Sequence, residues 1–135
     1  MDELLATSRV ARLATSDQYA KPHVVPIDFV WRQGVLYAPL DGEPQGDDDW
    51  HAPRLARNIE TNGRVSIVVD RWEEDPSGQP WILLDGLATI LEAGAERDEA
   101  AALLARKYPR YQRLPLDGRP LIRVAVEQIT RGARS

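Results

Sequence analysis

A chain of 135 residues is long enough to bury one sizeable core, and we expect a single domain spanning residues 1–135. Its composition, 43% hydrophobic and 28% charged, argues against disorder, and the net charge of −4 argues against a general nucleic-acid binder. The absence of cysteine excludes disulfides, thiolate nucleophiles and zinc–thiolate sites. No apolar run is long enough to span a membrane and the first residues lack a basic leader, so we expect a cytoplasmic protein with no membrane partner.

The first elements predicted along the chain are short. Residues 3–8 predict a helical turn with Leu4 and Leu5 directed inward. Residues 9–15 predict a strand, and the polar residues 16–18 that follow predict a turn.

The stretch from residue 21 to residue 40 organises the rest of the prediction. Residues 21–31 alternate at period two, Gln33-Gly34 allows a tight turn, and residues 35–38 resume a strand, so we expect the two runs to pair as a hairpin. Pro26 has no N–H to donate within the first run. Its strand therefore lies at a sheet edge, contains a bulge or forms a wall facing a ligand, and the pattern alone leaves edge and wall equally open.

The second half of the chain alternates strands with helices. Pro53 begins a helix that ends at Asn62-Gly63, and Gly86 marks a bulge in a long strand. The remaining predicted elements are strands over residues 64–70, 81–91 and 121–129 and a helix over 95–108. Six strands joined mostly by hairpins favour a mainly β fold, a small antiparallel β-barrel with helices over its openings, with an open α+β sheet as the alternative.

Candidate binding residues lie on the helix that begins at Pro53. Arg54 and Arg57 are three residues apart and share a helix face, so both guanidinium groups can reach one phosphate near the helix N-terminus, and Asn58 can add an amide hydrogen bond. On the residues alone, a solvated helix face explains the two arginines better.

Two further features have plainer explanations. His23 is more typical of a packed or surface histidine than of a catalytic group. Asp47, Asp48, Asp49 and His51 carry metal-ligand chemistry, but adjacent aspartates converge poorly, so we expect a solvated loop and no metal site.

Several segments, in this order, resemble the pyridoxamine 5'-phosphate oxidase-like family, whose fold is the FMN-binding split β-barrel. These segments are ATSD…KPHVVPIDF, RNIE…RVSIVVD and DGLATI. The resemblance extends over nearly the whole chain and is nearest to the F420-dependent (deazaflavin) oxidoreductases. It implies a six-stranded antiparallel split barrel.

The resemblance also implies a site and a reaction. It implies a homodimer with F420, or alternatively FMN, between the subunits, and hydride transfer to or from a small unsaturated or conjugated substrate. The backbone of Val25, Pro26 and Ile27 would line the ring, and Arg54, Arg57 and Asn58 would hold phosphate. The cofactor would carry the hydride, so no side chain need act as a covalent catalyst.

One departure from the family bears on the cofactor. Relatives place lysines after the third strand, where this chain has Glu43 and Gln45. The added negative field opposes binding of a polyanionic tail. A protein of the same fold that stores or senses a flavin, haem or another planar ligand without turnover is therefore the alternative function.

Overall fold

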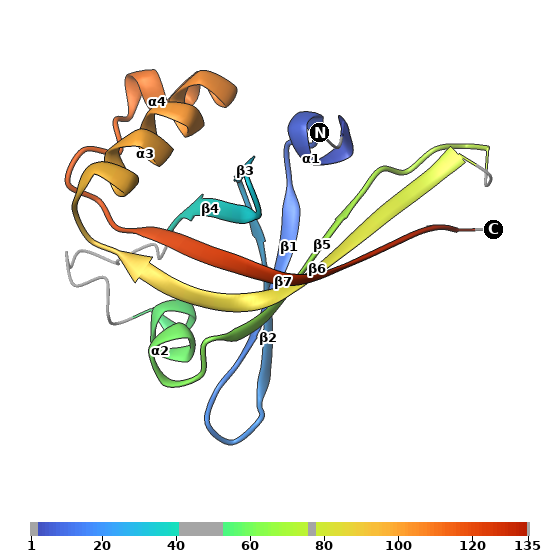
Figure 1. The fold of residues 1–135 in the computed structure, drawn as a ribbon, viewed down its shortest axis with the longest axis horizontal. Helices are drawn as coiled ribbons and strands as arrows, with labels where there is room; N and C mark the ends of the chain where they lie inside the picture. Colours follow the sequence, from blue (N-terminus) through green and yellow to red (C-terminus); the bar gives the residue numbers. More distant parts are fainter. Residues whose placement is uncertain (1–2, 41–52, 76–77, 135) are drawn as a thin grey trace.

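A computed structural model describes residues 3–40, 53–75 and 78–134, which form one antiparallel sheet and four helices (Figure 1). The neighbouring strands follow the order β2-β1-β5-β6-β7-β4-β3. The strands are β1 (Ala11–Ser16), β2 (Pro22–Ile27), β3 (Val30–Arg32), β4 (Val35–Pro39), β5 (Arg64–Asp70), β6 (Gln79–Leu91) and β7 (Leu121–Arg134). The helices are α1 (Glu3–Thr7), α2 (Arg54–Thr61), α3 (Ala95–Lys107) and α4 (Arg110–Arg113).

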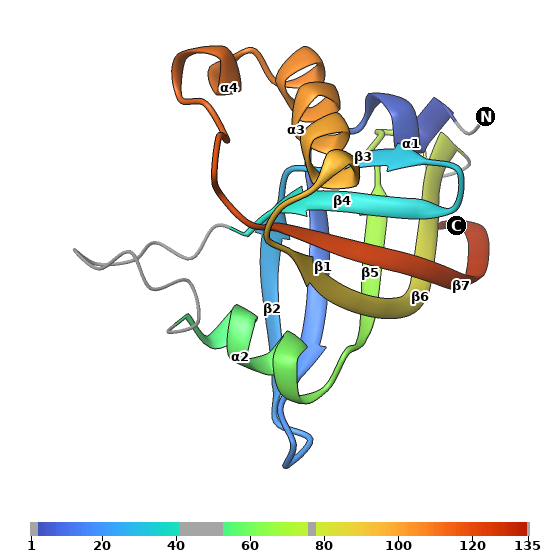
Figure 2. The ribbon, with the colours of Figure 1, turned by 60° about the vertical axis from the view of Figure 1, so that its left-hand side comes forward.

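The sheet curls into a half-barrel. Its two outermost strands, β2 and β3, are separated in sequence by only Asp28 and Phe29, so the ends of the sheet stay close together. Figure 2 shows the curl, with α2 at one end of it and α3 and α4 at the other. The prediction of a mainly β, antiparallel split barrel with helices over its ends is confirmed.

The core follows the alternation read from the sequence. Inward-facing residues such as Ile67, Leu84 and Val124 are completely buried, and their neighbours along each strand are more exposed. Leu4 and Leu5 of α1 join the same core, as predicted. The period-two pattern predicted β5 with the bounds that the structure shows, and it predicted which face of β7 is buried.

The predicted strand count of six is wrong, because the structure has seven strands within its described ranges. The run predicted as one strand divides into β2 and β3, which lie at opposite ends of the sheet order, so only β3 forms the predicted hairpin with β4. The cause is a group of side chains from the C-terminal half. The Phe29 N–H donates to the Tyr108 hydroxyl at 3.0 Å, and the Phe29 carbonyl accepts from Lys107 at 2.9 Å. The backbone at Phe29 is therefore satisfied by side chains instead of by a strand.

We expect Tyr108→Phe to lower the free energy of unfolding by about 2 kcal/mol, because it leaves a buried backbone N–H without an acceptor. The same hydroxyl lies 3.0 Å from the Arg9 carbonyl, so the N-terminal segment also loses a contact. Urea denaturation measures the change, and amide exchange at Phe29 should accelerate. Tyr19→Phe, at a side chain that is 82% exposed, is the matched control. Equal stability of the two variants would contradict this account of the strand break.

The bulge predicted at Gly86 is confirmed. The register between β6 and β7 shifts between Asp85 and Gly86, and a Cβ atom on Gly86 would lie 2.3 Å from the Ala125 carbonyl oxygen. Glycine is required here by the close approach of two backbones. The bulge bends β6 so that its second half continues around the curled sheet.

Helix α3 is fastened to the sheet by a carboxylate. Glu96 accepts hydrogen bonds from the Tyr37 hydroxyl at 2.5 Å and from Arg123 at 2.7 Å. These bonds, the Tyr37 bond first and the Arg123 bond second, lower the pKa of Glu96 below its ordinary value. Because the folded pKa is depressed, the contribution of Glu96 to stability is present above about pH 4.5 and is lost as the pH falls below it.

We expect Glu96→Gln to cost less than about 1 kcal/mol at pH 7, because the site is partly solvated and screened. The difference between wild type and variant should shrink as the pH falls through 4, since the wild-type carboxylate is then protonated. Urea midpoints at pH 7, 5 and 3.5 test this. Glu92→Gln, at an exposed carboxylate, is the control for the loss of one negative charge. A gap that stays constant across this range would contradict it.

None of the helices in the described ranges combines the length and the hydropathy of a membrane span.

The helix predicted from Pro53 is confirmed as α2, and the helix predicted over residues 95–108 is confirmed as α3. The expectations for Glu43, Gln45, Asp47–Asp49 and His51 concern residues outside the described ranges.

Candidate functional site

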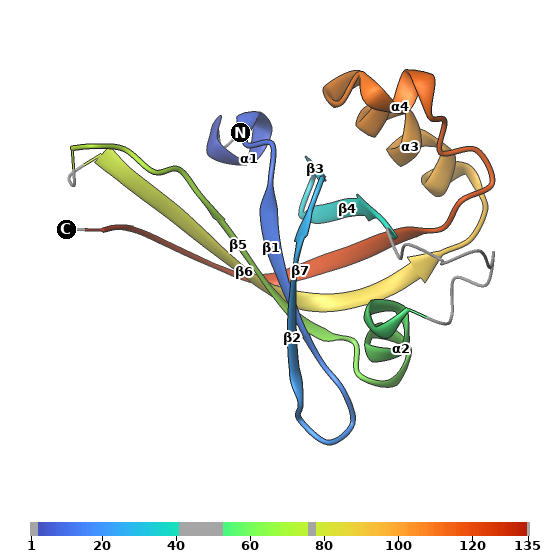
Figure 3. The same ribbon diagram turned by 180° about the vertical axis from the view of Figure 1, so that it is seen from behind.

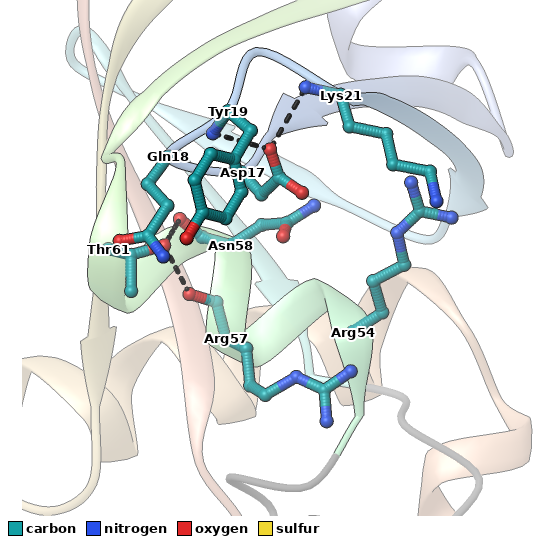
Figure 4. Close-up of a pocket in the computed structure, with 8 residues that line it drawn as sticks. All are labelled: Asp17, Gln18, Tyr19, Lys21, Arg54, Arg57, Asn58 and Thr61. Carbon is teal, nitrogen blue, oxygen red and sulfur yellow. Dashed lines mark hydrogen bonds between the residues drawn. The ribbon is translucent and has the colours of Figure 1, made fainter.

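A cavity of about 400 Å³ lies between the β1–β2 turn and helix α2 (Figure 4). This volume is in the range of small-molecule binding sites. The turn and the helix each contribute four residues. The lining consists of Asp17, Gln18, Tyr19, Lys21, Arg54, Arg57, Asn58 and Thr61.

The turn side of the cavity is held rigid by Asp17. Its carboxylate accepts from the backbone N–H of Tyr19 at 2.8 Å and from that of Lys21 at 2.9 Å. These bonds, the one from Lys21 foremost, keep the pKa of Asp17 below its ordinary value. The carboxylate is therefore committed to the turn, which fixes the backbone of Lys21 at the edge of the cavity.

Helix α2 provides the other wall. Its apolar residues Leu55, Ala56 and Ile59 are buried against the sheet, which leaves Arg54 and Arg57 on the opposite side. Asn58 is also buried, and its amide donates to the Thr15 hydroxyl at 3.0 Å. The role that the structure gives to the Asn58 side chain is to anchor α2 on β1.

The cavity is positively charged overall. Lys21, Arg54 and Arg57 supply three cationic groups against the single carboxylate of Asp17. Arg54 donates to the Pro22 carbonyl at 3.1 Å, which holds its guanidinium at the start of β2. In Figure 4 the Arg54 side chain extends toward Lys21, whereas Arg57 extends away from both. This arrangement can bind an anion by charge-assisted hydrogen bonds.

The predicted ring-lining residues lie farther along β2. Val25 and Ile27 direct their side chains into the core, and Pro26 is exposed. Pro26 is four residues beyond Pro22, about 13 Å along an extended strand. The structure therefore brings Arg54, Arg57 and Asn58 together in one cavity, and it places Val25, Pro26 and Ile27 outside the lining of that cavity, on the same edge strand.

His23 lies at the cavity end of β2, opposite Thr15. Its Nδ1 atom is buried and has no hydrogen-bond partner in the part of the chain that the structure describes. Burial, and secondarily the nearby charge of Arg54, lowers the pKa of the imidazole. His23 is therefore neutral near pH 7.

Sequence reasoning missed Lys21 as a member of the site. Lys21 and Arg54 are far apart in sequence and meet only because α2 packs beside the β1–β2 hairpin. One signal was available in the sequence, because Lys21 directly precedes the proline-containing strand.

Within the described ranges, no cluster of three or more potential metal-ligating side chains is present.

Comparison with solved structures shows where this fold occurs. A FAD-binding protein from Mesorhizobium loti is 24% identical, covers 98% of this chain and 91% of its own, and has a TM-score of 0.72. The haem storage protein HutZ from Vibrio cholerae is 22% identical, with coverages of 98% and 90% and a TM-score of 0.75. HupZ from group A Streptococcus is 19% identical, with coverages of 100% and 95% and a TM-score of 0.68. At these identities the likeness establishes the fold.

No curated protein matches the sequence. The family model described as pyridoxamine 5'-phosphate oxidase matches residues 1–131, which is almost the whole chain. The match agrees with the curled antiparallel sheet and with the sequence motifs that pointed to it. This chain is therefore a member of the pyridoxamine 5'-phosphate oxidase family, whose fold is a flavin-binding one.

Proposed function

We propose that this protein is an oxidoreductase that uses the deazaflavin F420, or alternatively FMN, for hydride transfer with a small unsaturated or conjugated substrate. The observation that carries the proposal is the cationic cavity between the β1–β2 turn and α2, in a family with a flavin-binding fold. The cofactor supplies the hydride chemistry when it is bound. The protein binds and orients it.

Arg54 and Lys21 hold the cofactor phosphate, and Arg57 adds a third charge at the rim. Arg54 is fixed at Pro22, so a phosphate bound there lies at the start of β2. From that point the strand leads toward Pro26, and the Val25–Ile27 backbone would line the ring of a bound cofactor. Because β2 pairs with β1 alone, its other edge is open to a ligand within the described sheet.

The cofactor site is completed by a second copy of this chain. The outer surface of β2 carries Val24, which is 61% exposed, and Pro26, which is also exposed. In Figure 3 no helix lies in front of β2. Light scattering during size-exclusion chromatography should therefore give twice the mass of the chain, and Val24→Arg should shift it toward the monomer.

The function is tested by titrating the purified protein with F420 and with FMN, followed by turnover assays on quinones and enones. Binding of either cofactor together with cofactor-dependent substrate reduction is the expected result. The relative affinities decide between F420 and FMN. Failure to bind either cofactor would overturn the proposal.

Storage or sensing of haem, without turnover, is the second candidate function. It is favoured by the likeness of the fold to the haem storage protein HutZ and by His23, whose imidazole is of the kind that ligates haem iron. Because the Nδ1 atom of His23 is buried, iron cannot approach that nitrogen, so the flavin proposal is stronger. A Soret band that shifts on His23→Ala, with no flavin binding, would favour the haem reading.

A further inference from the structure

Lys107, at the end of α3, has an unusual environment for a lysine. Its Nζ atom lies 3.9 Å from the ring centroid of Phe29, whose side chain is completely buried. It also lies 5.4 Å from the ring centroid of Tyr108. Among the described residues, its hydrogen-bond acceptor is the Phe29 carbonyl at 2.9 Å, and no carboxylate lies within ion-pair distance. The ammonium group is therefore partly desolvated, and the carboxylate of Asp28 acts on it only from beyond ion-pair distance.

The charged groups around Lys107 come from three parts of the chain. Arg9, before β1, donates to the Lys107 carbonyl and stacks on the Tyr108 ring, 5.5 Å from its centroid. Asp28, between β2 and β3, accepts from Arg110 and from the Tyr111 hydroxyl. The carboxylate of Asp28, whose charge acts on Lys107, is therefore already engaged by α4.

A cavity of about 270 Å³ adjoins this cluster. It is lined by Arg9, Asp28, Tyr108, Pro109 and Arg110. Two guanidinium groups against one engaged carboxylate give it a positive charge. Lys107 is not itself a lining residue, but its amine lies 5.4 Å from the ring centroid of Tyr108, which is one. The cavity can accept a small dianion such as phosphate. It shares no lining residue with the cationic cavity between the β1–β2 turn and α2, which we call the cofactor cavity.

We propose that Lys107 is a modification site at which the amine is acylated by small acyl phosphates, with Arg9 and Arg110 holding the phosphate. The neutral nitrogen attacks the carbonyl carbon, so a C–N bond forms and the C–O bond to phosphate breaks. Phosphate leaves with the electron pair, and the amine proton passes to water. The product is an uncharged amide.

The protonation state of the amine agrees with this assignment. Burial, and secondarily the charge of Arg9, lowers the pKa of Lys107 to about 8. At pH 7 about one molecule in ten then carries the neutral amine, compared with roughly one in 2,500 for an ordinary lysine of pKa about 10.4. Lower basicity weakens the nucleophile by roughly tenfold on the Brønsted slope known for thiols. A net advantage of roughly tenfold or more remains.

The chain provides its own comparison, because Lys21 is the other lysine and is exposed. We expect acetyl phosphate at pH 7 to acetylate Lys107 roughly ten times faster than Lys21, as measured by peptide mass spectrometry. At pH 9 the ratio should fall to about two, since most of the Lys107 amine is neutral well before that pH, whereas an ordinary lysine is still gaining neutral amine. Equal rates at pH 7, or a ratio independent of pH, would overturn the proposal.

Two further measurements test the role of the cavity. Inorganic phosphate should slow acetylation of Lys107 by acetyl phosphate in the wild-type protein, without slowing its reaction with the neutral reagent N-acetoxysuccinimide. Arg110→Gln should slow the first reaction at least threefold and leave the second unchanged. If both reactions slow alike, or if neither slows, binding of the phosphate by this cavity is excluded. The phosphate competition uses the wild-type protein, so it decides the point even if the variant is unstable.

Discussion

Replacing both Arg54 and Arg57 by alanine should weaken cofactor binding by at least about 100-fold, because each charge-assisted hydrogen bond to a phosphate contributes roughly 1.5–3 kcal/mol. Arg54 should account for more of the loss than Arg57. It is held at the cavity by the Pro22 carbonyl, whereas Arg57 is exposed and extends away from Lys21 in Figure 4. Fluorescence or absorbance titration with F420 and FMN measures both contributions.

The matched control removes the same charge elsewhere. Arg106 on α3 and Arg113 on α4 are both exposed, and neither lines the cofactor cavity. The double variant Arg106→Ala with Arg113→Ala changes net charge equally and should leave affinity within about twofold. If the two double variants lose the same affinity, the effect comes from the overall field of the protein and the phosphate assignment is wrong.

Lys21→Ala separates the site as observed from the site as predicted from sequence. The amine extends toward Arg54 across the cavity, so its loss should weaken binding by about tenfold and reduce the dependence of affinity on salt. The same titration measures this change. Unchanged affinity would leave the two arginines as the whole of the phosphate site.

Local features of the chain were predictable from its sequence. Arg54, Arg57 and Asn58 reached one site because they are neighbours on a single helix, where spacing alone decides which residues adjoin. The buried face of β5 and the bulge at Gly86 followed from alternation and from one glycine in an apolar run. In each case the deciding residues are close together in the chain.

The features that were missed depend on contacts between distant segments. The break between β2 and β3 is made by Tyr108, which is 79 residues from Phe29, and no pattern within residues 21–31 encodes it. Lys21 joined the site because a helix from the middle of the chain packs beside the first hairpin. Burial of the Asn58 amide against Thr15 belongs to the same class, since a hydrophobic pattern does not show which polar side chain anchors a helix.

Gly86→Ala should lower the free energy of unfolding by about 3 kcal/mol, at the upper end of the range for overpacking. The new Cβ would lie 2.3 Å from the Ala125 carbonyl oxygen and 3.0 Å from the Val126 Cα atom. Both are backbone atoms, so no side chain can rotate away and the two strands must separate. Urea denaturation with an unchanged m-value measures the loss.

Thr89→Ala, at an exposed position farther along β6, is the matched control and should change stability by less than about 0.5 kcal/mol. Gly86 is not part of the lining of the cofactor cavity, so molecules of Gly86→Ala that fold should bind cofactor with wild-type affinity. Loss of affinity without loss of stability would place the bulge in the binding site. Loss of stability alone would show that its function is to bend β6 around the half-barrel against which α2 and the cofactor cavity are built.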